Sequence, residues 1–196
     1  MTVGSDAPVF AVWRHPPPRD VQGRCIGRTD VPLDRRKAKR LAHRIRRWAR
    51  QHGAAHVVLT SNLQRAASVG RVLAGWGWQH RIDSRLNEMN FGRWDGLPWD
   101  RIGADAVDIW CNGFATHKPG GGESVAELLA RCAAFLGAPP PSAPCCIVGH
   151  AGWISAMLWL QRAGTEAPSA TEWPAAVRYA SLVLLGRAAL SPRRGA

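Results

Sequence analysis

The sequence predicts an α/β fold, a three-layer α/β/α sandwich built on a mostly parallel mixed sheet. Short apolar runs at residues 8–13, 56–60 and 145–148 are typical of strands that are buried on both faces of a sheet. Each run is followed by a segment in which apolar residues recur at helical spacing. Strands that alternate with helices favour parallel pairing, because a parallel connection needs a long crossover.

The first elements are defined by where charge and turn-forming residues interrupt the apolar runs. Residues 8–13 (PVFAVW) predict a buried strand, and residues 16–33, rich in Pro and Gly, predict a loop. Asp34 can cap a helix over about residues 35–51, since its side chain can accept from the free N–H groups of a first turn.

The second strand and helix follow in the same way. Residues 56–60 (HVVLT) predict a buried strand. Ser61 or Asn62 can cap the next helix, which is expected to extend through Leu73. Residues 76–100 predict a third short strand and a long loop that contains tryptophans.

A capping box marks the start of a later helix. Ser124 and Glu127 have the S-x-x-E spacing ahead of an apolar stretch, and residues 137–144 (GAPPPSAP) are expected to end that helix. The other expected elements are a helical stretch near residues 105–115, a strand at 145–148, a helix at 151–163 and a final strand at 178–186.

Length and composition fit one globular domain. The 196 residues are expected to form a single domain, with a core over about residues 8–187 and a short loose C-terminal tail, SPRRGA. Apolar residues make up 46% of the chain, which excludes a disordered protein. The net charge of +12 attracts anions, but it does not choose among a phosphorylated metabolite, nucleic acid and a membrane surface.

Cysteines and the N-terminus bear on location. The five cysteines are odd in number and form no C-x-x-C motif, so reduced thiols are expected rather than a disulfide frame or a zinc site. The N-terminus has no basic region followed by an apolar one, and no run approaches the ~18 apolar residues of a membrane span. We therefore expect a cytoplasmic protein without membrane contact.

Side chains that bind anions follow three of the expected strands. Arg14 and His15 come directly after the first strand, Arg65 lies in the first turn of the helix after the second, and His150 separates a later strand from its helix. Ligands of open α/β sheets gather beyond the carboxyl ends of the strands, and helix N-termini there favour negative charge. Forked arginine donors suit phosphate oxygens, so the sequence predicts a phosphate site at this edge.

At these positions the sequence resembles the histidine phosphatase superfamily, also called phosphoglycerate-mutase-like, from about residue 10 to residue 185. Each matching motif is weak alone, but all of them occur in the order that the family has them. They are V-W-R-H at 12–15, G-R-T-D-V-P-L at 27–33, L-T-S-N-L-Q-R-A at 59–66, L-N-E-M-N-F-G-R-W-D-G at 86–96, G-G-G-E-S at 120–124 and V-G-H-A-G at 148–152.

The resemblance implies a phosphomonoesterase that needs no metal and no cofactor. His15 would attack phosphorus and form a phosphohistidine intermediate. Arg14, Arg65 and His150 would hold the phosphoryl oxygens. Glu88 matches the family's acid and would protonate the leaving group.

The loop after Arg14 and His15 bears on the choice of substrate. Arg28 and Thr29, in this loop, are assigned to substrate binding by the same resemblance. Residues 14–16 (RHP), followed by residues 23–33 (GRCIGRTDVPL), resemble the alpha-ribazole phosphatases of cobalamin synthesis, which would make the substrate alpha-ribazole 5′-phosphate. Pro16 replaces the family's usual glycine after the histidine, so any phosphate contact from that backbone N–H is lost.

Three alternatives stay open. The substrate could be another small phosphorylated metabolite, or the chain could be a phosphoglycerate mutase, although mutases are usually longer. The third alternative is a catalytically weak relative that binds anions or nucleic acid, because residues 35–50 carry nine basic side chains. No aromatic series accompanies them, so the expected partner is a small phosphorylated metabolite rather than nucleic acid. A homodimer is also left open.

Overall fold

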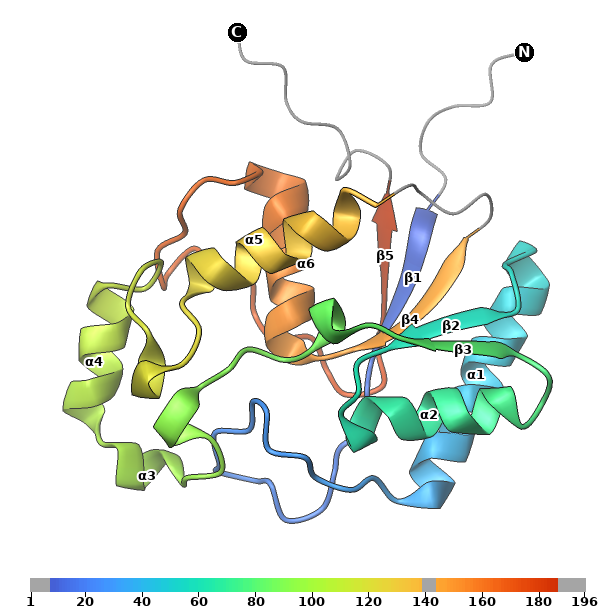
Figure 1. Cartoon of the computed structure of the whole chain (residues 1–196), viewed down its shortest axis with the longest axis horizontal. Coiled ribbons are helices and arrows are strands. Elements are labelled where there is room, and N and C mark those ends of the chain that lie inside the picture. Colours follow the sequence, from blue (N-terminus) through green and yellow to red (C-terminus); the bar gives the residue numbers. More distant parts are fainter. Residues whose placement is uncertain (1–7, 139–143, 187–196) are drawn as a thin grey trace, which may run out of the picture.

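The computed structural model describes residues 8–138 and 144–186, and its strands form one sheet in the order β3-β2-β4-β1-β5 (Figure 1). The first four strands of this order are parallel neighbours, and the last is antiparallel to β1. The expected loose tail, 191–196, lies outside the described residues. The strands are β1 (Pro8–Arg14), β2 (Val57–Thr60), β3 (Gln79–Ile82), β4 (Cys145–Gly149) and β5 (Leu182–Gly186).

Helices cover both faces of the sheet, so the predicted three-layer sandwich is confirmed (Figure 1). Successive strand residues point to opposite faces. In β1, Ala11 and Trp13 pack with α1 and α2, whereas Phe10 and Val12 pack with α5 and α6. These helices are α1 (Arg35–His52), α2 (Gln64–Ala74), α5 (Val125–Leu136) and α6 (Ala151–Ala163).

The caps of α1 and α5 form as predicted. The Asp34 carboxylate accepts hydrogen bonds from the backbone N–H groups of Arg36 and Lys37, at 2.8 and 3.2 Å. Ser124 and Glu127 make both bonds of the capping box ahead of α5. Such caps replace hydrogen bonds that the first turn of a helix cannot make internally.

The predicted cap of α2 is wrong. The N-cap residue is Leu63, and it makes no side-chain cap bond. The Ser61 hydroxyl lies 2.7 Å from Nε2 of His150. It also accepts a longer hydrogen bond, of 3.3 Å, from the backbone N–H of Leu63. The shorter contact of Ser61 is therefore a tertiary one with His150, whereas the local sequence pattern assigned this side chain to the cap of α2.

Several short helices lie between β3 and α5 in the chain. The expected helix near residues 105–115 is α4 (Ala104–Asn112), preceded by α3 (Trp99–Ile102). Between β3 and α5 lie the single-turn helices η1 (Ser84–Leu86), η2 (Gly92–Trp94) and η3 (Pro119–Gly121). A side chain at Gly92 or Gly120 would collide with the other segment's backbone, so these glycines permit η2 and η3 to touch.

The final strand is shorter than expected. It begins at Leu182 rather than at residue 178, because Ala180 has a φ of 57°, which breaks an extended strand. Ala180 N–H still donates to the Arg14 carbonyl at 3.0 Å. The turn before β5 is thereby held against the end of β1. In the part of the chain that the structure describes, no helix is long and apolar enough to cross a membrane.

Candidate active site

The carboxyl ends of β1 and β4 bring two histidines together. These strands are parallel neighbours, with Arg14 in register with Gly149, so His15 and His150 follow at the same level. The backbone N–H of His15 donates to the Gly149 carbonyl at 3.0 Å. The two imidazole ring centres are 5.1 Å apart.

His15 is buried, with 5% of its surface exposed. Its Nδ1 lies 2.8 Å from the carbonyl oxygen of Pro16. A carbonyl only accepts, so Nδ1 carries the proton and Nε2 keeps its lone pair. Burial, followed by the positive charge of Arg65, lowers the pKa of His15 to about 3. The imidazole is therefore neutral near pH 7, and Pro16, whose N–H is missing, orients it through its carbonyl.

Two arginines add positive charge to this place from different elements. Nη1 of Arg14 donates to the Val177 carbonyl at 2.7 Å, and Nε of Arg14 is buried without a hydrogen-bond partner among the described residues. Arg65, in the first turn of α2, is 1% exposed. Both arginines act electrostatically on the two histidines, lowering the pKa of each.

His150 completes the group. It is fully buried, and its Nε2 lies 2.7 Å from the Ser61 hydroxyl. Its Nδ1 is buried and has no hydrogen-bond partner within the described residues. Burial and the nearby His15 hold the pKa of His150 well below its ordinary value. His150 also precedes the first turn of α6, where free N–H groups favour an anion.

Glu88 is fixed at the same helix terminus. Its carboxylate accepts from the backbone N–H groups of Gly152 at 3.1 Å and Trp153 at 3.2 Å, and from that of Met89 at 3.0 Å. Glu88 is 7% exposed, and its charge partly opposes the burial that lowers the pKa of the Arg65 guanidinium. A Cβ on Gly152 would stand 2.6 Å from Oε1 of Glu88, so a side chain at this position would displace the carboxylate.

Asp95 organises the loop that holds Arg65. Its carboxylate accepts from the backbone N–H groups of Gly27, Arg28 and Thr29, and from the Thr29 hydroxyl at 2.6 Å. Nη1 and Nη2 of Arg65 donate to the carbonyls of Thr29 and Gly27, at 2.8 and 2.5 Å. Asp95 thus positions Arg65 through the loop, a role that sequence reasoning missed because both contacts link distant segments.

The two loop residues assigned to substrate binding, Arg28 and Thr29, make different contacts. The Thr29 hydroxyl donates to Asp95, so it supports the loop. Arg28 donates from Nε to the backbone carbonyl of Glu88 at 2.8 Å. Burial, followed by the charge of Arg131, lowers the pKa of Arg28. Arg28 is therefore the member of this pair that brings a cation beside Glu88.

A partly buried ion pair fastens the segment that carries Glu88. Nη2 of Arg131 lies 2.8 Å from the Glu123 carboxylate, and Nη1 of Arg131 donates to the carbonyls of Arg85 and Asn87, each at 2.8 Å. The side chains of this pair are 16% and 13% exposed. The pair links α5 to residues 85–87, immediately before Glu88.

Tyr179 is a second residue that the sequence did not reveal. It lies in the turn before β5, and the Arg14 guanidinium stands 3.7 Å from its ring centre. The ring centre of Tyr179 is 5.5 Å from that of His15. With 39% of its surface exposed, Tyr179 forms part of the outer rim beside the nucleophile candidate. The only signal in the sequence is its place before a strand that pairs with β1.

Three tryptophans between β3 and α5, Trp94, Trp99 and Trp110, pack in an aromatic cluster. Trp110 packs edge-on against Trp94 and Phe91, with ring centres 6.0 and 5.8 Å apart. Trp99 packs edge-on against Phe91 at 6.4 Å and is 39% exposed. Trp94 and Trp110 therefore support the loop that carries Glu88 and Asp95, while Trp99 keeps an open face.

The chain matches a known protein family over almost its whole length. The family model of the histidine phosphatase superfamily (branch 1) matches residues 10–190. A glucosyl-3-phosphoglycerate phosphatase of Mycobacterium tuberculosis (strain CDC 1551 / Oshkosh) is 36% identical over 133 residues, which are 61% of this chain and 58% of that protein. The chain thus matches rather more than half the length of this curated relative.

Two solved structures are similar over most of both chains. A structure described as mycobacterial hydrolase 1 has 26% sequence identity and a TM-score of 0.70, covering 88% of this chain and 86% of that chain. A mycobacterial glucosyl-3-phosphoglycerate phosphatase in complex with VO3 has 29% identity and a TM-score of 0.70, covering 88% of this chain and 90% of that chain.

Proposed function

We propose that this chain, which belongs to the histidine phosphatase superfamily (branch 1), hydrolyses phosphate monoesters through a phosphohistidine on His15. The observation that carries the proposal is the state of His15. The ring is buried and neutral, its Nδ1 is engaged by the Pro16 carbonyl, and Nε2 keeps a lone pair for attack.

The surrounding cations suit the two negative charges of a phosphate monoester. Arg14 and Arg65 would hold the phosphoryl oxygens with charge-assisted hydrogen bonds. The unpartnered Nδ1 of His150 and Nε of Arg14 are further donors at the same place, when His150 carries its proton on Nδ1. Donors that are fixed before the reaction stabilise charge as it moves onto those oxygens.

The reaction would proceed in two steps. In the first, Nε2 of His15 bonds to phosphorus as the bond to the leaving oxygen breaks, and protonated Glu88 gives that oxygen its proton. In the second, Glu88 takes a proton from water, which attacks phosphorus, breaks the bond to His15 and releases phosphate. Such acid–base help is typically worth ~10²–10⁴-fold in rate.

Two candidate substrates rest on different observations. The curated relative reported above is a glucosyl-3-phosphoglycerate phosphatase, which favours a phosphorylated glycerate that carries a sugar. The alpha-ribazole expectation rests on residues 14–16 and 23–33 alone. Both are small phosphorylated metabolites, and both would place a ring beyond the phosphate, where Tyr179 is exposed beside His15.

A phosphomonoester panel tests the proposal. Wild type and His15→Ala would be compared in EDTA with glucosyl-3-phosphoglycerate, alpha-ribazole phosphate, 3-phosphoglycerate and p-nitrophenyl phosphate. His56→Ala, which changes an exposed histidine immediately before β2, is the matched control. We expect phosphate release that survives EDTA, persists in the control and disappears in His15→Ala.

The same panel contains the results that would refute the proposal. A requirement for added metal, or activity that persists in His15→Ala, would contradict the mechanism. Isomerisation of 3-phosphoglycerate without phosphate release would indicate a mutase. A substrate assignment fails if that compound turns over no faster than p-nitrophenyl phosphate.

A further inference from the structure

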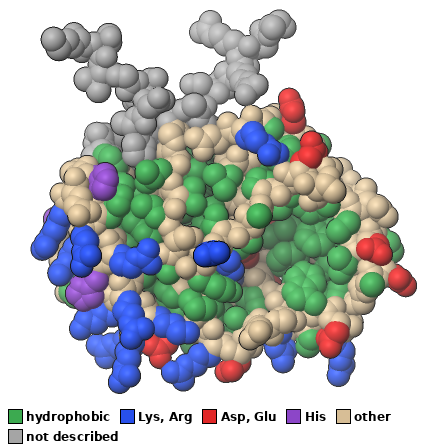
Figure 2. Space-filling view, turned by 180° about the vertical axis from the view of Figure 1, so that it is seen from behind, with side chains coloured by type: hydrophobic (Ala, Val, Ile, Leu, Met, Phe, Trp, Pro, Cys, Tyr) green, Lys and Arg blue, Asp and Glu red, His purple; other side chains and the backbone are tan. Residues whose placement is uncertain are grey.

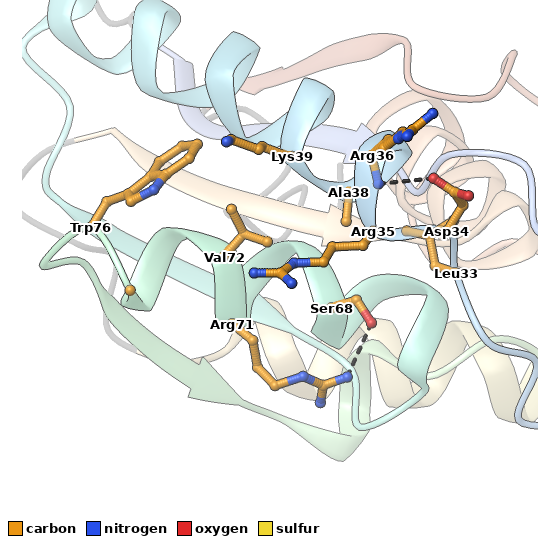
Figure 3. A pocket seen from close by; sticks show the side chains of 11 residues that line it. Leu33, Asp34, Arg35, Arg36, Ala38, Lys39, Ser68, Arg71, Val72 and Trp76 are labelled. Carbon is orange, nitrogen blue, oxygen red and sulfur yellow. Dashed lines mark hydrogen bonds between the residues drawn. The ribbon is translucent and has the colours of Figure 1, made fainter.

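A groove of about 850 Å³ lies between the beginning of α1 and the second half of α2 (Figure 3). Ala38 and Val72 give it an apolar floor, and Trp76 stands at one end. None of Arg14, His15, Arg65, Glu88 or His150 lines it, so it is distinct from the candidate active site. Its volume lies in the range of about 300–1,000 Å³ that is common for small-molecule sites.

The side chains that line this groove are strongly cationic. Arg35, Lys39 and Arg71 border it, and in Figure 3 the Arg35 guanidinium extends across it toward α2. The one carboxylate in the lining is Asp34. That carboxylate already caps α1 and pairs with Arg19 at 2.8 Å. The groove therefore keeps an excess of positive charge that an anion would neutralise.

This charge is local rather than a uniform property of an arginine-rich chain. Nine of the 26 Lys and Arg residues lie in α1, and none of the 14 Asp and Glu residues does, so α1 carries nine of the twelve net charges. None of the salt bridges among the described residues involves a Lys or Arg of α1. Figure 2 shows Lys and Arg side chains gathered on the side of the molecule where α1 lies.

The structure also supplies the aromatic neighbour that the basic segment lacks in sequence. Trp76 comes from the turn after α2, far from α1 in the chain, and lies at the same end of the groove as Lys39 (Figure 3). His43 of α1 packs on Trp76 with ring centres 4.6 Å apart, and the Arg46 guanidinium stands 4.8 Å from the Trp76 ring centre. The indole is thus held in place at the groove's edge.

We propose that this groove binds a nucleotide, with Arg35 and Arg71 on its phosphates and its base against Trp76. The forked guanidinium groups match phosphate oxygens, and an indole offers a surface to any base. The hydroxyl of Ser68, in the lining, accepts a hydrogen bond from Arg71 at 3.0 Å, and the lining holds no histidine that could activate it, so the ligand is bound and not hydrolysed there. A free nucleoside triphosphate and one unit of a single-stranded nucleic acid present the same chemistry.

Binding titrations with two probes test the proposal and separate these sources. The probes are a fluorescent ATP analogue and a fluorescein-labelled single-stranded oligothymidylate, each followed by anisotropy at moderate salt. The His15→Ala chain prevents turnover, and inorganic phosphate fills the candidate active site. The variants are Arg35→Glu with Arg71→Glu, Trp76→Ala, and a matched charge control that reverses two exposed arginines outside the groove, Arg50→Glu with Arg101→Glu.

We expect at least one probe to bind, the groove charge reversal to weaken it tenfold or more, and the control to weaken it less than threefold. Trp76→Ala should weaken the nucleotide probe but not tripolyphosphate, which has no ring. Binding of the oligonucleotide alone would identify the ligand as a single-stranded nucleic acid. Binding of the ATP analogue would identify it as a free nucleotide.

Other results would overturn the proposal. One such result is that neither probe binds. Another is an equal loss of affinity in the groove and control variants, which would show that only net charge matters. An unchanged affinity in Trp76→Ala would remove the base from the assignment. Circular dichroism checks that each variant is folded, and Arg35→Gln with Arg71→Gln repeats the test with a milder change. The same groove substitutions, made in the chain that retains His15, should leave phosphatase activity at the wild-type level.

Discussion

Replacing Asp95 with asparagine is expected to lower kcat/KM for p-nitrophenyl phosphate about a hundredfold. The Asp95 carboxylate holds three successive backbone N–H groups, those of Gly27, Arg28 and Thr29, and the two carbonyls of this loop hold Arg65. An amide turns one acceptor oxygen into a donor that faces these N–H groups, and each lost charge-assisted bond is worth about 1.5–3 kcal/mol.

The loss should reach Arg65 through the loop. A shift of ~1 Å in a group that positions substrate can cost ~10²-fold in rate. That factor corresponds to about 2.7 kcal/mol of transition-state stabilisation. Thr29→Val, which removes only the hydroxyl bond of 2.6 Å to Asp95, should cost less, about 1.5 kcal/mol.

A double-mutant cycle gives the decisive assay. Steady-state kinetics would be measured for Asp95→Asn, Arg65→Lys and both together, with Asp100→Asn as an exposed matched control. If Asp95 acts through Arg65, the double variant should lose much less than the product of the single losses. Independent losses that multiply, with unchanged thermal stability, would refute this reasoning.

Three further predictions concern the same site. Gly152→Ala should lower kcat about ten- to a hundredfold, because its Cβ would stand 2.6 Å from the carboxylate of Glu88, the proposed acid. Tyr179→Ala should raise KM about two- to thirtyfold by removing the ring 3.7 Å from Arg14, an interaction worth about 0.5–2 kcal/mol, whereas Tyr179→Phe should keep the wild-type KM. The pKa of His15 is lowered to about 3, so this histidine favours the native state above pH 6.5 and loses that effect as the pH falls from 6.5 toward 3. In urea titrations, His15→Asn should reduce the fall in unfolding free energy by up to about 1.4 kcal/mol per pH unit in that range.

Each of these predictions has a result that would contradict it. Gly137→Ala adds the same methyl group at a helix end where it meets only ordinary contacts, so an equal kcat loss there would remove the link to Glu88. A Tyr179→Phe variant with the KM of Tyr179→Ala would assign the effect to the hydroxyl instead of the ring. Parallel unfolding curves for wild type and His15→Asn at every pH would show that His15 titrates normally.

The sequence predicts well what depends on neighbours along the chain. The strand ends that place Arg14, His15 and His150 follow from apolar runs that stop at charged or polar residues, and the caps of α1 and α5 follow from local hydrogen-bonding patterns. The layers follow from the alternation of strands and helices.

The features that escaped prediction are contacts between distant segments. Asp95 acts on a loop more than sixty residues earlier, and Tyr179 meets Arg14 from the other end of the chain. Ser61 looks like a helix cap locally but faces His150, which follows a neighbouring strand. Trp76 gives the basic helix an aromatic neighbour only once α1 and α2 lie side by side.

The central claim, a phosphohistidine on His15, is tested most directly by trapping the intermediate. Enzyme turning over a good substrate in EDTA would be quenched in alkali, where phosphohistidine is stable, and mapped by peptide mass spectrometry. We expect one phosphoryl group on the peptide that carries His15, formed at least as fast as phosphate is released. Turnover without any phosphorylated peptide, or with phosphate on another residue, would contradict the account.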